Sequence, residues 1–235
     1  MDFGPIFQKY EELLRLADDT FEKVKSRYPD KVRCETRCAD CCHALFDLSL
    51  VEALYINHHF NRRFQALERE KIIDRANKAD RQTYKIKRRA YREVSEGKDE
   101  AEVIAQVGAE RVRCPLLNEE DLCDLYDHRP ITCRFYGIPT QIGGEGHSCG
   151  KSGFVPGEPY PTVKLEVIHQ QLLALSREIA DLLQSRYKRL SEMLVPVSMA
   201  LLTQYDEEYL GARPAADKEE EGGAGEKTSG TGGGR

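Results

Sequence analysis

Apolar positions recur at helical spacing in two long stretches of the chain. From Thr162 they stand three or four residues apart at Leu165, Ile168, Leu172, Leu175, Ile179 and Leu182. Before Pro29 the same spacing, with charged residues between, runs through Ile6, Phe7, Tyr10, Leu13, Leu14, Ala17, Phe21 and Val24. This pattern predicts amphipathic helices that each bury one face. We expect the second seam to pack along the first helix; a homodimer through residues 165–183 is the alternative.

Further helices are indicated between and after these two. The segment Ser49-Leu-Val-Glu52 has the form of a capping box, which predicts that a helix begins there. A charged helical stretch covers about residues 66–96 and ends at Gly97, and a shorter helix follows at about 99–110. A last short helix is expected over about 197–208, after Pro196.

Residues 113–160 have a different character, because proline and glycine become frequent there. We expect loops, turns and short hairpin strands in this segment, with Gly143-Gly-Glu-Gly146 as a hairpin turn. Its apolar content is too low for folding by hydrophobic burial alone. Such a segment needs a staple, and a bound metal would supply one.

These patterns predict a mainly α fold, a helical domain built around a cysteine-rich, loop- and short-hairpin-containing metal-binding region. We expect a single domain over residues 1–210, with the metal region at 30–150 and the C-terminal helices at 162–208. Residues 211–235 are rich in glycine and glutamate and are predicted to be a disordered tail.

The eight cysteines form two groups of four. The first group falls within nine residues, which is too dense for ordinary core packing, and the second is more widely spaced. Thiolates are soft anionic ligands that crowd together favourably only around a cation. We therefore predict as metal ligands Cys34, Cys38, Cys41, Cys42, Cys114, Cys123, Cys133 and Cys149.

The spacing leaves the identity of the metal open. Eight thiols suit two tetrahedral zinc ions, one cubane iron–sulfur cluster with spare thiols, or a mixed arrangement. Because neighbouring side chains tend to point apart, we expect Cys42 to reach a second metal or to be a free thiol beside Cys41. His43 and His147 are secondary candidate ligands. Cations that could offset the charge of the thiolates flank the cysteines: Arg33, Arg37, Arg113, Arg134 and Lys151.

Other interpretations of the cysteines are weaker. The spacing from Cys34 to Cys41 matches the radical-SAM cluster motif, but Asp40 stands where those enzymes usually have an aromatic residue. The chain also shows helices rather than an alternating β/α pattern. A disulfide framework is disfavoured because the N-terminus is not a signal peptide and no apolar run approaches the ~18 residues of a membrane span. We therefore expect a cytoplasmic protein with reduced thiols and no membrane contact.

Charge argues against nucleic acid as a partner. The net charge is −5 over 235 residues. Residues 81–92 do contain six cations, no acid and the tyrosines Tyr84 and Tyr91, a composition that can grip phosphates and stack on bases. We nevertheless expect a solvated helix face there, which is the commoner cause of such a run.

The ordered series of cysteine motifs resembles the YkgJ-type cysteine-cluster family over about residues 30–150. The matching elements are the first four cysteines, then Cys114-Pro-Leu-Leu, Cys123 with Tyr126, Arg129-Pro-x-x-Cys133-Arg134, and Cys149. The resemblance implies a zinc- or iron-chelating domain with metal ions as its ligands. Flagellin lysine N-methylases share a related cluster, and members are often called iron–sulfur oxidoreductases. The resemblance leaves enzymatic activity undecided, and the sequence contains no evident catalytic motif.

Overall fold

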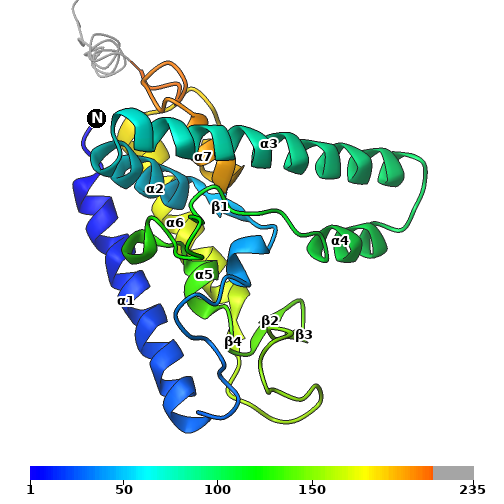
Figure 1. Ribbon diagram of the computed structural model, residues 1–235. Coiled ribbons are helices and arrows are strands. Elements are labelled where there is room, and N and C mark those ends of the chain that lie inside the picture. The colour runs from blue at the N-terminus through cyan, green and yellow to red at the C-terminus, as the bar shows by residue number, and fades with distance from the viewer. Residues whose placement is uncertain (214–235) are drawn as a thin grey trace, which may run out of the picture.

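The computed structural model describes residues 1–213 and has a mainly helical architecture, as expected (Figure 1). The α-helices of this part of the chain are α1 (Gly4–Arg27), α2 (Leu50–Arg63), α3 (Ala66–Ser95), α4 (Glu100–Gly108), α5 (Ile131–Phe135), α6 (Leu165–Leu183) and α7 (Val197–Leu202). Short 3-10 turns are η1 (Cys41–His43), η2 (Tyr126–His128) and η3 (Leu190–Glu192). The strands are β1 (Asp47–Ser49), β2 (Thr140–Ile142), β3 (Glu145–His147), β4 (Val163–Lys164) and β5 (Leu194–Pro196).

Local signals set the start of α2 and the boundary between α3 and α4 where the sequence predicted them. The Glu52 carboxylate accepts a hydrogen bond from the Ser49 backbone N–H at 3.0 Å, and the capping box begins α2. The Asp99 carboxylate accepts from the Glu102 N–H at 2.9 Å and caps α4. Gly97 separates α3 from α4 with φ of +91°, a conformation that favours glycine.

Helices α1, α2 and α6 share the larger hydrophobic core. The α6 seam residues Ile168, Leu172, Leu175 and Ile179 are buried there, which supports the core-helix interpretation. Leu182, at the end of the seam, is 51% exposed. The homodimer through residues 165–183 stays a prediction.

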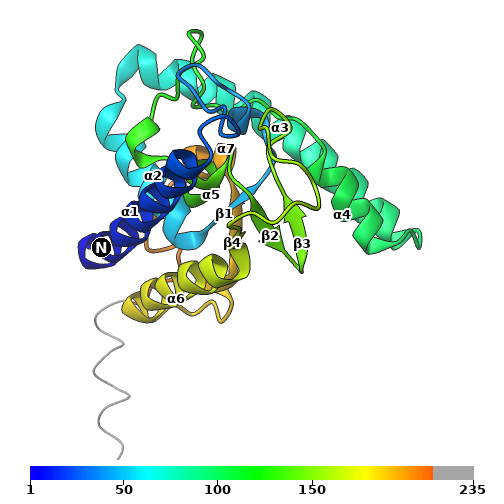
Figure 2. The same ribbon diagram turned by 90° about the horizontal axis from the view of Figure 1, so that it is seen from below.

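Helix α2 is central because it contributes to two cores. Its residues Leu54 and Tyr55 face the core with α1 and α6, whereas Ile56 and Phe60 face a second core with α3 and α7. A helix that is apolar on most sides is buried by neighbours on most sides. Figure 2 shows α1 and α6 on one side of this central helix and α3 beyond it.

The strands join distant parts of the chain. Antiparallel pairing of β1 with β5 connects segments that the sequence did not link, with Leu48 opposite Val195. Strands β2 and β3 form the predicted hairpin around Gly143 and Gly144, and β4 pairs in parallel with β2. The 113–160 segment also contains the short helix α5, which composition had not indicated.

The last helix is shorter than predicted. α7 ends at Leu202 instead of near residue 208, because the Asn57 amide donates to the backbone oxygens of Ala200 (2.9 Å) and Thr203 (3.0 Å). These bonds satisfy carbonyls at the helix end and let the chain turn away. Residues 211–213 continue the fold, since the Arg186 N–H donates to the Gly211 oxygen at 2.9 Å. The rest of the tail predicted to be disordered, residues 214–235, lies outside the described residues.

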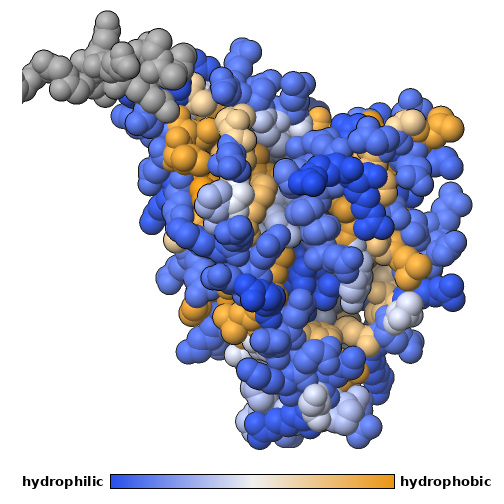
Figure 3. All heavy atoms as spheres, turned by 90° about the vertical axis from the view of Figure 1, so that its left-hand side faces the viewer, coloured by the Kyte–Doolittle hydropathy of each residue, from blue (hydrophilic) through white to orange (hydrophobic). Residues whose placement is uncertain are grey.

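The surface is largely hydrophilic on the face that carries α1, with small separate apolar patches (Figure 3). Within the described residues, none of the helices has the length and apolar character needed to cross a membrane.

Candidate metal centre

The first cysteine segment leaves the end of α1 and forms two tight turns. The Cys38 N–H donates to the Glu35 oxygen at 3.0 Å, and Arg37 between them adopts a φ of +70°. This left-handed residue reverses the chain direction inside the first cysteine spacing. The 3-10 turn η1 then carries Cys41 and Cys42 together.

The second cysteine segment lies directly against η1. The Cys114 N–H donates to the Cys42 oxygen at 2.7 Å, and the Val112 N–H donates to the His43 oxygen at 3.0 Å. These backbone bonds place Cys114 beside Cys42, although the two residues lie far apart in the chain. A bridge between Leu117 and Cys123 closes the following loop and returns Cys123 toward the same place.

Helix α5 brings in Cys133. The buried Glu52 carboxylate accepts the N–H of Ile131 at 3.2 Å, which fixes the first turn of α5 against α2. Arg134 is only 5% exposed and forms an ion pair with Asp18 of α1. The guanidinium also donates to the Asp127 oxygen at 2.7 Å. The charge of Arg134 is therefore used between helices rather than at a thiolate, which differs from its predicted role.

All eight cysteines line two adjoining cavities. An inner cavity of about 50 Å³ is bounded by Cys41, Cys42, Cys114, Cys123 and Cys133. An outer cavity of about 790 Å³ is bounded by Cys34, Cys38, Cys41, Cys42, Cys123, Cys133 and Cys149. Four cysteines thus lie between the two spaces and face both. The fold brings the two sequence groups to one place, and none of the eight forms a disulfide.

The adjacent cysteines do not point apart as the sequence suggested. The Sγ atoms of Cys41 and Cys42 lie 3.9 Å apart because the tight 3-10 turn directs both to the same side. In a tetrahedral zinc site with bonds of about 2.3 Å, neighbouring sulfurs lie about 3.8 Å apart. This pair therefore has the spacing of two ligands of one ion.

The remaining thiols are near but not converged. Among the described residues, no three cysteine, histidine, aspartate or glutamate side chains are arranged so that they could hold a metal ion as they stand. The donor set fits zinc or iron by its chemistry and by the space that it surrounds, since soft thiols line both cavities. Coordination requires several of these side chains to turn toward a common centre.

The buried thiols are expected to be neutral without a cation. Burial raises the pKa of Cys114 to about 12 and of Cys123 to about 11. Burial also raises the pKa of Cys133 well above its usual value, and nearby Cys41 adds to the effect. In the adjacent pair, the hydrogen bond between the sulfurs lowers the pKa of Cys41 and raises that of Cys42, so one proton leaves more readily than two.

Asp40 is a site residue that the sequence reasoning did not identify as one. Its carboxylate accepts from the Tyr136 hydroxyl (2.9 Å), the Arg111 guanidinium (2.8 Å) and the Cys149 thiol (3.5 Å). Burial opposes its charged form, but the Tyr136 hydrogen bond and the Arg111 charge outweigh this and lower its pKa. The sequence feature that could have identified Asp40 is its position between Cys38 and Cys41.

Neither His43 nor His147 lines the two cysteine cavities. The Nδ1 atom of His43 lies 3.0 Å from the Ala39 oxygen, and His147 is exposed on β3. His59 stacks on His128 with ring centroids 3.5 Å apart.

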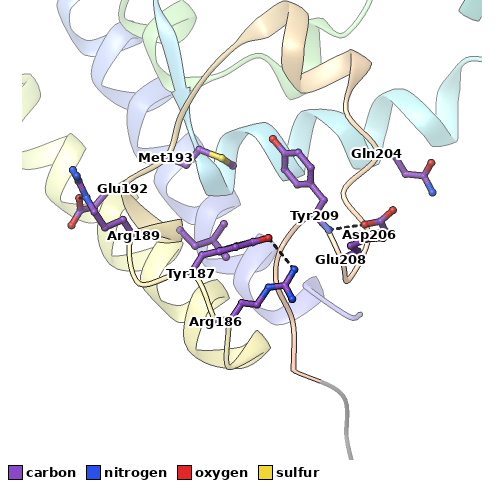
Figure 4. A pocket seen from close by; sticks show the side chains of 10 residues that line it. Arg186, Tyr187, Arg189, Glu192, Met193, Gln204, Asp206, Glu208 and Tyr209 are labelled. Atoms are coloured by element: carbon purple, nitrogen blue, oxygen red, sulfur yellow. Dashed lines mark hydrogen bonds and ion pairs between the residues drawn. The ribbon is translucent and has the colours of Figure 1, made fainter. Parts of the chain in front are cut away.

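A separate hollow near the end of the described chain offers no comparable donor set. It encloses about 820 Å³ and contains no cysteine. Figure 4 shows its charged and aromatic side chains, several of which already bond to one another. The Arg186 guanidinium donates to the Tyr187 hydroxyl at 3.1 Å, and Arg189 pairs with Glu192 at 2.7 Å.

A helical domain that collects free thiols from two loop segments around adjoining cavities has the features of a metal-chelating cysteine-cluster domain. Residues 33–150 match the CxxCxxCC family model, described as a "putative zinc- or iron-chelating domain". The chain belongs to this family, the one that its cysteine motifs resembled. Its first spacing has three residues rather than two, and the left-handed Arg37 lies in it. No curated protein and no solved structure matches the chain.

Proposed function

We propose that this protein binds zinc or iron through all eight cysteines, and that the metal joins residues 34–43 to residues 114–149. The observation that carries this proposal is the gathering of both cysteine groups around two adjoining cavities. Backbone hydrogen bonds, such as the one that the Cys114 N–H donates to the Cys42 oxygen, hold the two cysteine groups together without involving the sulfur atoms. A cation between the thiols would add to the apolar contacts that residues such as Leu116, Ile131 and Phe135 already make in the two cores.

The spacing of one pair favours zinc ions over a single cubane cluster. In a cubane cluster each thiolate binds a different iron at a separate corner, so ligand sulfurs stand well apart. The 3.9 Å between the sulfurs of Cys41 and Cys42 suits two ligands of one tetrahedral ion. Under this proposal Cys42 is a ligand rather than a spare thiol.

We further propose that residues 1–210 work as one domain in the cytoplasm. All eight cysteines are free thiols, a state that a reducing compartment maintains. The helices at 162–208 would then serve as scaffold for the metal region at 30–150, since α6 packs on both α1 and α2.

Anaerobic purification followed by elemental analysis and visible spectroscopy tests the proposal. We expect a colourless protein with about two zinc ions per chain, because eight thiolates satisfy two tetrahedral sites. A brown protein whose visible absorption bleaches on reduction would show an iron–sulfur cluster, which is the basis of the alternative oxidoreductase or flagellin-lysine-methylase-like function. A protein without zinc or iron under these conditions would refute metal binding.

Cysteine substitutions locate the site. Cys133→Ser at the inner cavity and Cys38→Ser at the outer cavity should each lower the metal content and reduce the free energy of unfolding by several kcal/mol, because metal binding and folding are coupled. Ser148→Ala is the matched control, since this exposed residue adjoins Cys149 without a thiol. Unchanged metal content in both cysteine variants would contradict a site shared by the two groups.

A further inference from the structure

The basic run at residues 81–92 becomes two sets of side chains in the folded protein. Lys87 donates to both carboxylate oxygens of Asp47, at 2.7 and 2.6 Å, and Arg89 pairs with Glu110. These two cations are neutralised within the fold.

The other four cations are available to a partner. Within the part of the chain that the structure describes, Arg81, Lys85 and Arg88 have no ion pair, and Arg92 reaches only Glu96 at 3.8 Å. All four side chains are exposed. Their intervals of four, three and four residues place them on one face of α3.

Two tyrosines stand on the same face. Tyr84 is 62% exposed and Tyr91 is 78% exposed, and neither ring packs on another aromatic ring among the described residues. Seven residues separate them, about 10 Å along the helix axis. Ala79, Thr83 and Ile86 form the buried face of this part of α3, on the opposite side. We call the exposed set, Arg81, Tyr84, Lys85, Arg88, Tyr91 and Arg92, the basic stripe.

The basic stripe lies on a projecting arm. Figures 1 and 2 show the distal part of α3 and the antiparallel α4 extending together beyond the rest of the molecule. Residues 81–92 contain no acid, and the two acids that flank this run each have a partner in the fold. Asp80 accepts a hydrogen bond from the Ser198 hydroxyl at 3.3 Å, and Glu93 forms an ion pair with Lys98 at 3.5 Å. A projecting, unneutralised face is accessible to an extended polymer.

We propose that the basic stripe binds single-stranded nucleic acid. Regularly spaced cations can follow a phosphate backbone, and exposed tyrosine rings can stack on unpaired bases. The stripe contains no aliphatic side chain, whereas the centre of a protein–protein interface is depleted in charge and rich in apolar contacts. The net charge of −5, on which the opposite expectation rested, describes the whole chain. At physiological salt, charges are screened beyond about 8 Å, so a strand bound on the stripe interacts mainly with the stripe's cations and little with the acids elsewhere on the protein.

Fluorescence anisotropy with a labelled mixed-sequence single-stranded oligonucleotide, over a series of salt concentrations, tests this proposal. With four phosphate contacts, log K should fall with log salt at a slope of about −3. The double variant Arg81→Gln/Arg88→Gln should halve this slope and weaken binding about tenfold at low salt. Tyr84→Ala should weaken binding about fivefold or more while leaving the slope unchanged.

Lys23→Gln/Lys188→Gln is the matched control, because it removes the same charge from exposed lysines outside the stripe. It should bind as the unmodified protein does, and circular dichroism confirms that each variant is folded. Absence of binding at low salt, or an equal loss in the control, would overturn the proposal. So would equal displacement of the oligonucleotide by poly-glutamate, which would indicate an acidic protein partner instead. These measurements do not depend on the metal content of the protein.

Discussion

Gly137 connects the backbone of the cysteine-rich segment to the position of one thiol. Its φ is +105°, and a Cβ atom added there would lie 2.2 Å from the Sγ of Cys34. Non-bonded heavy atoms normally lie about 3.5 Å or more apart, so the sulfur would have to move by more than about 1 Å. Cys34 also donates weakly to the Tyr136 oxygen at 3.6 Å, a contact that such a movement would break.

The substitution Gly137→Ala should therefore act in two ways. The left-handed backbone costs about 1–2 kcal/mol for any residue with a side chain. Overpacking against the sulfur adds about 1–3 kcal/mol, so the free energy of unfolding should fall by about 2–5 kcal/mol in total. Under the proposed function Cys34 must turn its thiol toward a metal, and the added methyl group restricts the positions that this thiol can reach, so metal content should drop.

Gly97→Ala separates the two effects. Gly97 has a φ of +91°, but an added Cβ would meet nothing within 4 Å. Its cost should be the backbone strain alone, about 1–2 kcal/mol, with metal content unchanged. Urea unfolding and elemental analysis of both variants give the comparison. Equal losses of stability with full metal content in both would refute the inference that Gly137 makes room for a ligand.

Three further predictions concern the scaffold. Arg134→Ala should lower the free energy of unfolding by about 2–3 kcal/mol in chemical denaturation, less than for a fully buried pair because Asp18 is 42% exposed; a loss below 0.5 kcal/mol (roughly, a surface substitution) would contradict its structural role. Burial raises the pKa of Glu52, so its stabilising contribution is complete below about pH 4.3 and is lost as the pH rises through the folded-state pKa. The melting temperature of the unmodified protein should accordingly fall relative to that of Glu52→Gln over this range, and parallel pH profiles would argue against it. In α6, Leu172→Ala should cost about 2–5 kcal/mol and the half-exposed Leu182→Ala much less; the reverse order, with a change in sedimentation, would favour the dimer.

Helices were the part of the fold most accessible from sequence, because their signals are local. The periodic seam of α6, the capping box at Ser49 and the break at Gly97 each act over a few residues. The end of α7 was predicted wrongly because Asn57, from another helix, terminates it. The pairing of β1 with β5 was equally invisible, since neither three-residue strand carries a pattern of its own.

The candidate site divides in the same way. The sequence by itself determined the two cysteine groups, their candidacy as metal ligands and the family, because thiols at short spacings are a local and chemically specific pattern. Only the tertiary structure decided that Cys41 and Cys42 direct their sulfurs to one side, that Arg134 serves Asp18, and that Asp40 joins the site. It also decided which cations of α3 remain unpaired. These outcomes depend on contacts between residues distant in the chain, and the free energies of such contacts are set by packing rather than by neighbouring sequence.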